Sequence, residues 1–116
     1  MYSYTIEKDS VKIIEDSEKN LRKNDLEIFE TKAKAQARGK NELFRRLRKE
    51  WNRLDDYTDE RAVELEHLMY QDLSDHTDDY TENMYVIQML QDELAVTADD
   101  KRKEVIIHRL KELQEQ

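Results

Sequence analysis

The stretch Leu43–Leu54, with the sequence LFRRLRKEWNRL, decides the expected fold. Its large apolar residues follow one another at steps of three, four and three, and they are Phe44, Leu47, Trp51 and Leu54. That spacing places them in one stripe along a helix. The basic side chains of the stretch take the other sides of the helix. We therefore expect Leu43–Leu54 to be the end of a long helix with one apolar face.

The six residues that follow, DDYTDE at positions 55–60, reverse the charge and predict a turn. Asp and Thr side chains bond nearby backbone groups and so favour turns and helix starts. Asp59 and Glu60 suit the first turn of a helix, where the helix dipole favours acids. We expect a turn at about 55–58 and a second helix from about 59.

The composition favours long helices. The chain of 116 residues has the length of one domain, and it contains 0 Pro and 1 Gly, against average usage of about 5% and 7%. Hydrophobic content of 37%, charged content of 41% and a net charge of −8 are also compatible with disorder. Evenly spread Leu, Ile, Met and Tyr residues favour a folded chain.

Apolar residues at intervals of seven predict how far the first helix extends. Ile14, Leu21 and Ile28 form such a series, so we expect a helix over about 9–55, after frayed or extended residues 1–8. Gly39 is the one candidate break, since Gly within a helix costs about 1 kcal/mol relative to Ala. A kink or turn at Gly39 is the alternative to the continuous helix that the neighbouring residues favour.

The second helix is predicted over about 59–115. Its seam is a second series at intervals of seven: Leu73, Tyr80, Ile87 and Leu94. Short polar side chains at 74–79 predict a kink or loop. Thr97–Asp100 has the form of a helix cap and predicts a short C-terminal helical segment.

These features predict an all-α fold, an elongated antiparallel two-helix hairpin that is coiled-coil-like and forms a single domain over 1–116. The charge layout agrees with this expectation. Residues 32–53 carry nine bases against two acids, and residues 55–100 carry fifteen acids against one base. Folding at 55–58 would lay the basic segment beside the acidic one, although each exposed ion pair contributes only about 0–1 kcal/mol.

The sequence offers no reaction chemistry. The absence of Cys excludes disulfides, thiolate zinc sites and a Cys nucleophile. No Gly-rich loop could hold phosphates, and no Ser and His residues are grouped as a nucleophile with its base. We expect a protein that is not an enzyme and uses no cofactor.

Three candidate metal sites are weaker alternatives. Glu64 and His67 stand three residues apart, as in di-metal helical bundles, but the first helix has no second such pair. Glu104 and His108 could touch, without a third ligand. The acids at 72–79 lack the Gly and the terminal Glu of a calcium loop. Solvated acidic faces are the favoured interpretation, so no metal is predicted.

We expect no membrane span, because no run of about 18 apolar residues occurs. The first residues, MYSYTIEKD, do not have the form of a signal peptide. A cytoplasmic location, or export together with a partner, follows as the expectation. Nucleic-acid binding through the basic segment 32–53 is disfavoured, since the charge of −8 repels phosphates at long range.

Trp51-Asn52-Arg53 stands where the WXG100 (ESAT-6-like) proteins of type VII secretion have Trp-x-Gly, with Arg53 in place of the Gly. The Tyr-x-x-x-Asp/Glu export signal of that family is absent. In length and helical character the chain more closely resembles the LXG-associated small helical proteins of Gram-positive bacteria. This resemblance implies that the chain binds the long helical N-terminal domain of an LXG toxin. It also implies that the chain helps to target the toxin to the type VIIb secretion machine.

We therefore expect a targeting or chaperone-like protein that binds a partner with long helices, together with a second small helical protein in some assemblies. The residues predicted to form the interface are Phe44, Leu47, Trp51, Leu54, Leu73, Tyr80, Ile87 and Leu94. The alternatives are a self-assembling coiled-coil scaffold or assembly factor, for example of phage origin, and a nucleic-acid-binding regulator. A homodimer of this chain is also considered.

Overall fold

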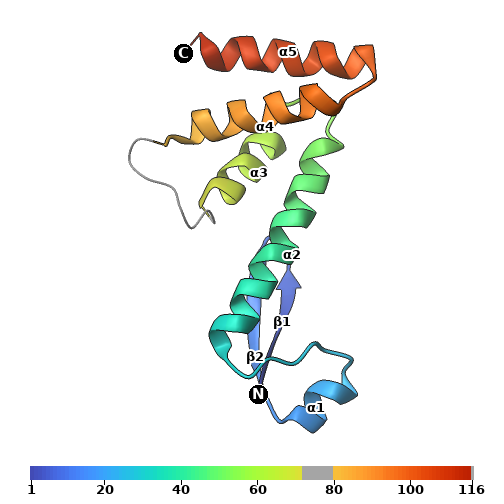
Figure 1. Ribbon diagram of the computed structural model, residues 1–116, viewed down its shortest axis with the longest axis vertical. Coiled ribbons are helices and arrows are strands. Elements are labelled where there is room, and N and C mark those ends of the chain that lie inside the picture. Colours follow the sequence, from blue (N-terminus) through green and yellow to red (C-terminus); the bar gives the residue numbers. More distant parts are fainter. Residues whose placement is uncertain (72–79, 116) are drawn as a thin grey trace. The chain divides into compact units, whose positions relative to one another are not determined.

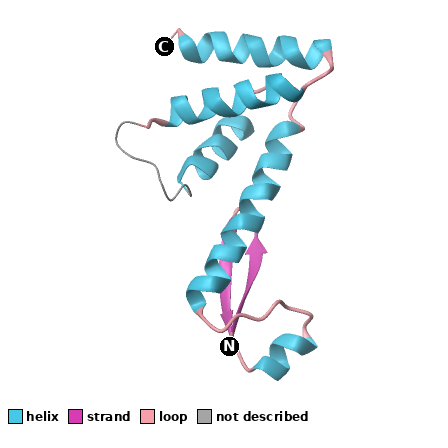
Figure 2. Cartoon of the chain, in the orientation of Figure 1, coloured by secondary structure: helices cyan, strands magenta, loops and turns pink. Residues whose placement is uncertain are grey.

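The computed structural model describes residues 1–71 and 80–115, with the elements placed along the chain as in Figures 1 and 2. The chain divides into two compact units, Met1–Leu47 and Arg48–Gln116, which we call the N-terminal and C-terminal units. The elements, in order, are β1 (Tyr2–Glu7), β2 (Ser10–Glu15), α1 (Glu18–Lys23), α2 (Lys32–Asn52), α3 (Glu60–Gln71), α4 (Glu82–Val96) and α5 (Asp100–Gln114). The predicted all-α two-helix hairpin is therefore wrong.

Strands β1 and β2 form an antiparallel hairpin at the start of the N-terminal unit (Figure 2). Tyr4 lies opposite Ile13 and Ile6 opposite Val11, and such aromatic and β-branched residues suit a pleated surface. Only Lys8 and Asp9 separate the strands, and Lys8 has a φ of 57°, which a tight hairpin turn requires. The helix expected from about residue 9 is wrong because these alternating residues pair as strands.

Helix α1 is short and capped at both ends. The Ser17 hydroxyl accepts a hydrogen bond from the Asn20 N–H at 3.2 Å, and Asp25 follows the helix with a φ of 56°. The series of apolar residues at intervals of seven does not mark one helix. Its members lie in β2, in α1 and in the loop after α1: Ile14, Leu21 and Ile28.

Helix α2 continues without interruption through Gly39, so the alternative of a break there is not realised. Gly39 is buried under the hairpin. A Cβ atom at this position would lie 2.5 Å from Val11 Cγ1 and 3.2 Å from the Tyr4 ring. The glycine therefore allows the hairpin to approach the helix closely.

A turn separates α2 from α3, where the sequence predicts one. Asp56 accepts hydrogen bonds from the N–H and hydroxyl of Thr58, at 2.8 and 2.6 Å. Asp59 accepts one from the N–H of Arg61 at 3.1 Å, in the first turn of α3. Short polar side chains thus bond the local backbone in this turn.

The single second helix expected over about 59–115 is wrong, since the described residues of this range, 59–71 and 80–115, form three separate helices (Figure 1). Thr81 caps α4 by accepting from the Met84 N–H at 3.2 Å, and Asp99 caps α5 by accepting from the Lys101 N–H at 3.0 Å. The predicted short C-terminal helical segment is present as α5. The expected kink at 74–79 and the predicted interface residue Leu73 lie outside the described residues.

The C-terminal unit has a core to which α2, α3, α4 and α5 all contribute. Its largest fully buried side chains are Trp51, Tyr57, Leu65, Met69, Leu90 and Ile106. The bundle is held by α3 against α4 and by α4 against α5. Among the helices of residues 1–71 and 80–115, none has both the length and the apolar character needed to cross a membrane.

Candidate protein-binding surface

Two aromatic rings and two arginines form a row in the C-terminal unit. The Trp51 and Tyr57 ring centroids lie 4.6 Å apart. The Arg48 guanidinium lies over Trp51, 4.9 Å from its centroid, and the Arg102 guanidinium lies over Tyr57 at 4.7 Å. Each cation–π contact of this kind contributes about 0.5–2 kcal/mol. Both rings are almost fully buried, so the row anchors the end of α2 within the unit.

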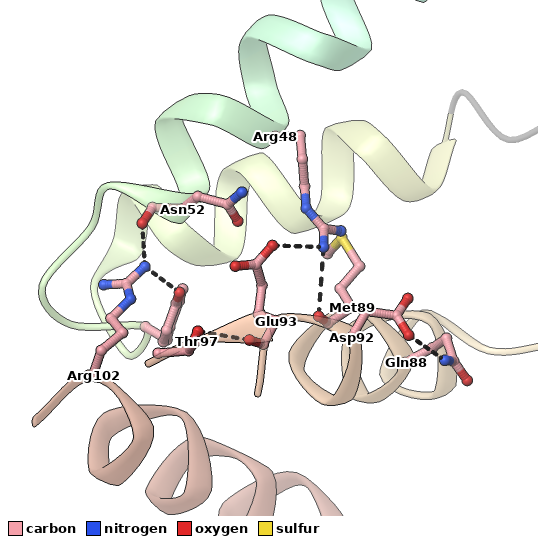
Figure 3. A network of polar contacts seen from close by, with 9 residues as sticks. Arg48, Asn52, Gln88, Met89, Asp92, Glu93, Thr97 and Arg102 are labelled. Carbon is pink, nitrogen blue, oxygen red and sulfur yellow. Dashed lines mark hydrogen bonds and ion pairs between the residues drawn. The ribbon is translucent and has the colours of Figure 1, made fainter. Parts of the chain in front are cut away.

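Arg102 links α5 to the C-terminal end of α2 (Figure 3). Its guanidinium donates hydrogen bonds to the carbonyl oxygens of Asn52 and Leu54 and to the Tyr57 hydroxyl. The last carbonyls of a helix have no partner within the helix and carry partial negative charge. The Arg102 guanidinium supplies both the missing donors and a compensating positive charge. Arg102, which is distant in sequence, therefore acts as a cap of α2.

Arg48 links α2 to α4. Its guanidinium donates to Glu93 Oε1 at 3.3 Å and to the Met89 carbonyl at 3.5 Å (Figure 3). In the opposite sense, Arg61 of α3 donates to both carboxylate oxygens of Glu50 on α2, at 2.6 and 2.9 Å. Bases and acids of these helices do pair, but the expected register of a two-helix hairpin is wrong because Arg48 meets α4 rather than α3.

A buried ion pair joins α3 to α5. Glu66 is 3% exposed, and the Arg109 guanidinium lies 3.6 Å from its carboxylate, which is longer than a hydrogen bond. Burial raises the pKa of Glu66 to about 7, against the opposing charge of Arg109. Arg109 also pairs with Glu112 on its own helix at 3.5 Å. The carboxyl of Glu66 is therefore held in an environment that disfavours its charged form.

The first half of the predicted interface lies largely inside the chain. Leu47 and Trp51 are 3% and 0% exposed, and Phe44 and Leu54 are half-buried. A helical stripe indicates burial, but it does not distinguish a partner within the chain from a separate protein. The role of these four residues at a partner interface stays a prediction, and their contacts here are internal.

Of the second half of the predicted interface, Tyr80 precedes α4, and Ile87 and Leu94 lie on it. Tyr80 is half-buried, its carbonyl accepts from the Tyr70 hydroxyl at 2.5 Å, and its ring lies 6.4 Å from that of Tyr85. Ile87 and Leu94 are half-buried on α4. Tyr80 is thus held in place just before the start of α4, whereas Ile87 and Leu94 retain exposed surface.

Helix α4 carries apolar side chains on two sides. Its buried side consists of Tyr85, Val86, Met89 and Leu90. A second row, at steps of three and seven residues, contains Met84, Ile87 and Leu94, and we call this row the outer strip of α4. Met84 is 49% exposed. A helix that is apolar on two sides usually has packing partners on both.

The histidines considered as metal ligands have surface carboxylate neighbours. His67 Nδ1 lies 2.7 Å from Glu82, and His108 Nε2 lies 3.1 Å from Glu112. Glu64, which the sequence places near His67, pairs with Arg61. In residues 1–71 and 80–115, no three acidic or His side chains are grouped to hold a metal ion. The acidic run at 72–79 lies outside this part of the chain.

Sequence reasoning missed Arg102 and Tyr57 as organising residues. They are separated by 45 residues, and no periodic pattern connects them.

Comparison of the chain with models of protein families, with curated proteins and with solved structures gave no match. The function has to be inferred from the residues of the chain itself.

Proposed function

We propose that this chain is a non-enzymatic protein-binding partner that packs the outer strip of α4 against a helix of another protein. The observation that supports the proposal is the second apolar side of α4, with Met84, Ile87 and Leu94 beside a fully used buried side. Burying such side chains favours association at about 25 cal/mol per Å² of apolar surface. Helix-on-helix packing is the recognition mode that this row suits.

We place the partner in the class that the resemblance implies, an exported toxin with a long helical N-terminal domain of the LXG type. In this role the chain shields apolar helices of the toxin and contributes to the surface that the type VIIb secretion machine recognises. The row of Arg48, Trp51, Tyr57 and Arg102 keeps the bundle in place while α4 presents its outer strip.

A pull-down from lysate of the native host tests this function. Tagged protein is captured after nuclease treatment, and the bound proteins are identified by mass spectrometry. The proposal predicts a stoichiometric larger protein with a helical N-terminal region. If only the tagged protein is recovered, and its molecular mass in solution increases with its concentration, the outer strip belongs to a self-assembling scaffold. If nuclease treatment removes the bound material, the chain is a nucleic-acid-binding protein.

A further inference from the structure

Strand β1 in the N-terminal unit has one edge that is only partly paired. In an antiparallel pair, alternate residues direct their N–H and C=O groups toward the neighbouring strand and away from it. The Tyr2 N–H and C=O both bond to Phe29, on the side away from β2, at 2.9 and 2.7 Å. Tyr4 and Ile6 stand at the next alternate positions, so their backbone groups face the same side as those of Tyr2.

The segment that pairs with Tyr2 leaves this edge before reaching Tyr4. It runs antiparallel to β1, so Glu27 and Asp25 would lie opposite Tyr4 and Ile6 if pairing continued. The Glu27 carbonyl instead accepts the Ser3 hydroxyl, and Asp25 has a φ of 56° that turns the chain. Within the described residues, the N–H and C=O groups of Tyr4 and Ile6 have no hydrogen-bond partner.

A hollow of about 300 Å³ lies along this edge. Besides β1 residues, its lining includes the acidic residues Asp25, Glu27 and Glu42 and the basic residue Arg46. Arg46 and the Tyr4 hydroxyl both bond to Glu42, at 2.9 and 2.5 Å. Glu27 pairs with Arg38 at 3.5 Å. Asp25 is exposed and has no charged partner among the described residues, so the hollow carries excess negative charge.

We propose that the outer edge of β1 binds an extended, lysine-bearing peptide segment as an added strand. The peptide backbone bonds to the open N–H and C=O groups of Tyr4 and Ile6, which only an extended chain can match in spacing. A lysine side chain of the peptide reaches the Asp25 carboxylate. This site lies in the N-terminal unit and uses backbone pairing, so it is separate from the helix packing proposed for α4.

Amide exchange of the full chain, followed residue by residue by NMR, tests the site. The probe is an acetylated and amidated octapeptide that alternates threonine and lysine. Saturating peptide is expected to slow exchange of the Tyr4 and Ile6 amides by about tenfold or more. The Val11 and Ile13 amides, on the outer edge of β2, serve as the internal reference and should not change. Unchanged exchange at Tyr4 and Ile6, or slowing at the β2 edge instead, would overturn the proposal.

A charge-swapped peptide and a variant of Asp25 test the charge recognition separately from the backbone pairing. The octapeptide with glutamate in place of lysine should bind at least tenfold more weakly to the native chain, and the variant Asp25→Lys should reverse this preference. Asp25 is exposed in a loop, and Lys8 of the same chain adopts a φ of 57° close to the 56° of Asp25, so this variant should fold. Equal binding of both peptides would overturn the role of Asp25. If exchange of the Tyr4 and Ile6 amides slows as the protein concentration is raised without any peptide, the edge binds a second copy of the chain. That result would overturn the proposal that a peptide occupies it.

A proline variant tests the backbone pairing directly. Ile6→Pro removes the open N–H and no bond to β2, and proline is tolerated at such edge positions. The matched control is Val11→Pro, the cross-strand neighbour whose N–H faces the outer edge of β2. Ile6→Pro should abolish binding of the lysine peptide, and Val11→Pro should retain it. Equal binding by two folded variants would overturn the site.

Discussion

Gly39 shows how a single residue determines the packing of the N-terminal unit. The sequence predicts a continuous helix here and offers a break at Gly39 only as the alternative, because Gly is a poor helix former. In the structure, Gly39 lies in the continuous helix α2 and faces Val11 and Tyr4 of the hairpin. The lack of a side chain is used for close approach, which sequence patterns alone do not reveal.

We expect Gly39→Ala to destabilise the chain by about 1–2 kcal/mol. Overpacking against Val11 costs about 1–3 kcal/mol, and the better helix propensity of Ala offsets up to about 1 kcal/mol of it. Urea unfolding followed by far-UV circular dichroism measures the change. In the Val11→Ala background the closest contact is gone and only the Tyr4 ring at 3.2 Å stays near the added methyl, so Gly39→Ala should cost clearly less than in the native chain. An equal cost in both backgrounds would show that the contact with Val11 is not the cause.

Glu66 gives a prediction for pH. Its pKa of about 7 in the folded chain lies above the ordinary value of 4.5, chiefly because of burial. The folded chain therefore binds more protons than the unfolded chain between these values, and its stability should fall as the pH rises from about 4.5 to 7. The groups that act on Glu66 are Arg109 of α5, which favours the charge, and Glu82 of α4, which opposes it.

We expect Glu66→Gln to remove most of this decline, which is up to about 3 kcal/mol in the native chain. The unfolding free energy is measured at several pH values from 5 to 8. Glu64→Gln is the matched control, since Glu64 is an exposed neighbour on α3, and it should keep the native slope. Equal slopes in the two variants would exclude Glu66 as the source of the pH dependence.

At the scale of elements, the ends of helices are easier to predict from the sequence than the elements that pack against them. The turn before α3 and the start of α5 both follow from local Asp and Thr side chains. The β-hairpin was missed, although Tyr2, Tyr4 and Ile6 alternate with smaller or polar residues as strand residues do. The series Ile14, Leu21 and Ile28 suggested a helix by chance spacing. Contacts such as that of Arg102 with Asn52, which is 50 residues away, leave no local signal.

The same limit applies to the candidate site. Ile87 and Leu94 were predicted from periodicity, and both keep exposed surface on α4. Leu47 and Trp51 were predicted by the same reasoning, and both are buried within the chain. Periodicity identifies a face that packs, whereas only the fold decides what packs against it.

We expect Arg102→Met to destabilise the C-terminal unit by about 2–4 kcal/mol. The change leaves the carbonyls of Asn52 and Leu54 without their donor and removes the contact with Tyr57. Unfolding is followed by the fluorescence of Trp51, the only tryptophan of the chain, which lies beside Tyr57. Lys101→Met, at an exposed neighbouring position, should cost less than about 0.5 kcal/mol. Similar losses in both variants would contradict the capping role.

At the scale of the whole molecule, charge and packing divide between the two units. The N-terminal unit carries eleven bases and nine acids, and the C-terminal unit nine bases and nineteen acids. The acidic unit is the one that contains α4 and its outer strip. A partner for this surface is therefore expected to combine an apolar helical face with basic flanks, since opposite charges at the rim speed association and set orientation.

The most direct test of the protein-binding function compares capture of the partner by three proteins in the same host lysate. They are the native chain, the variant Met84→Gln with Leu94→Gln, and the control Ile107→Gln, which makes the same kind of change at an exposed position on α5. Circular dichroism and Trp51 fluorescence confirm that each variant is folded. Interface residues of this kind contribute about 1–2 kcal/mol each, so the double variant should lose about tenfold or more of the captured partner, while the control captures as much as the native chain. Full capture by the folded double variant would contradict the account.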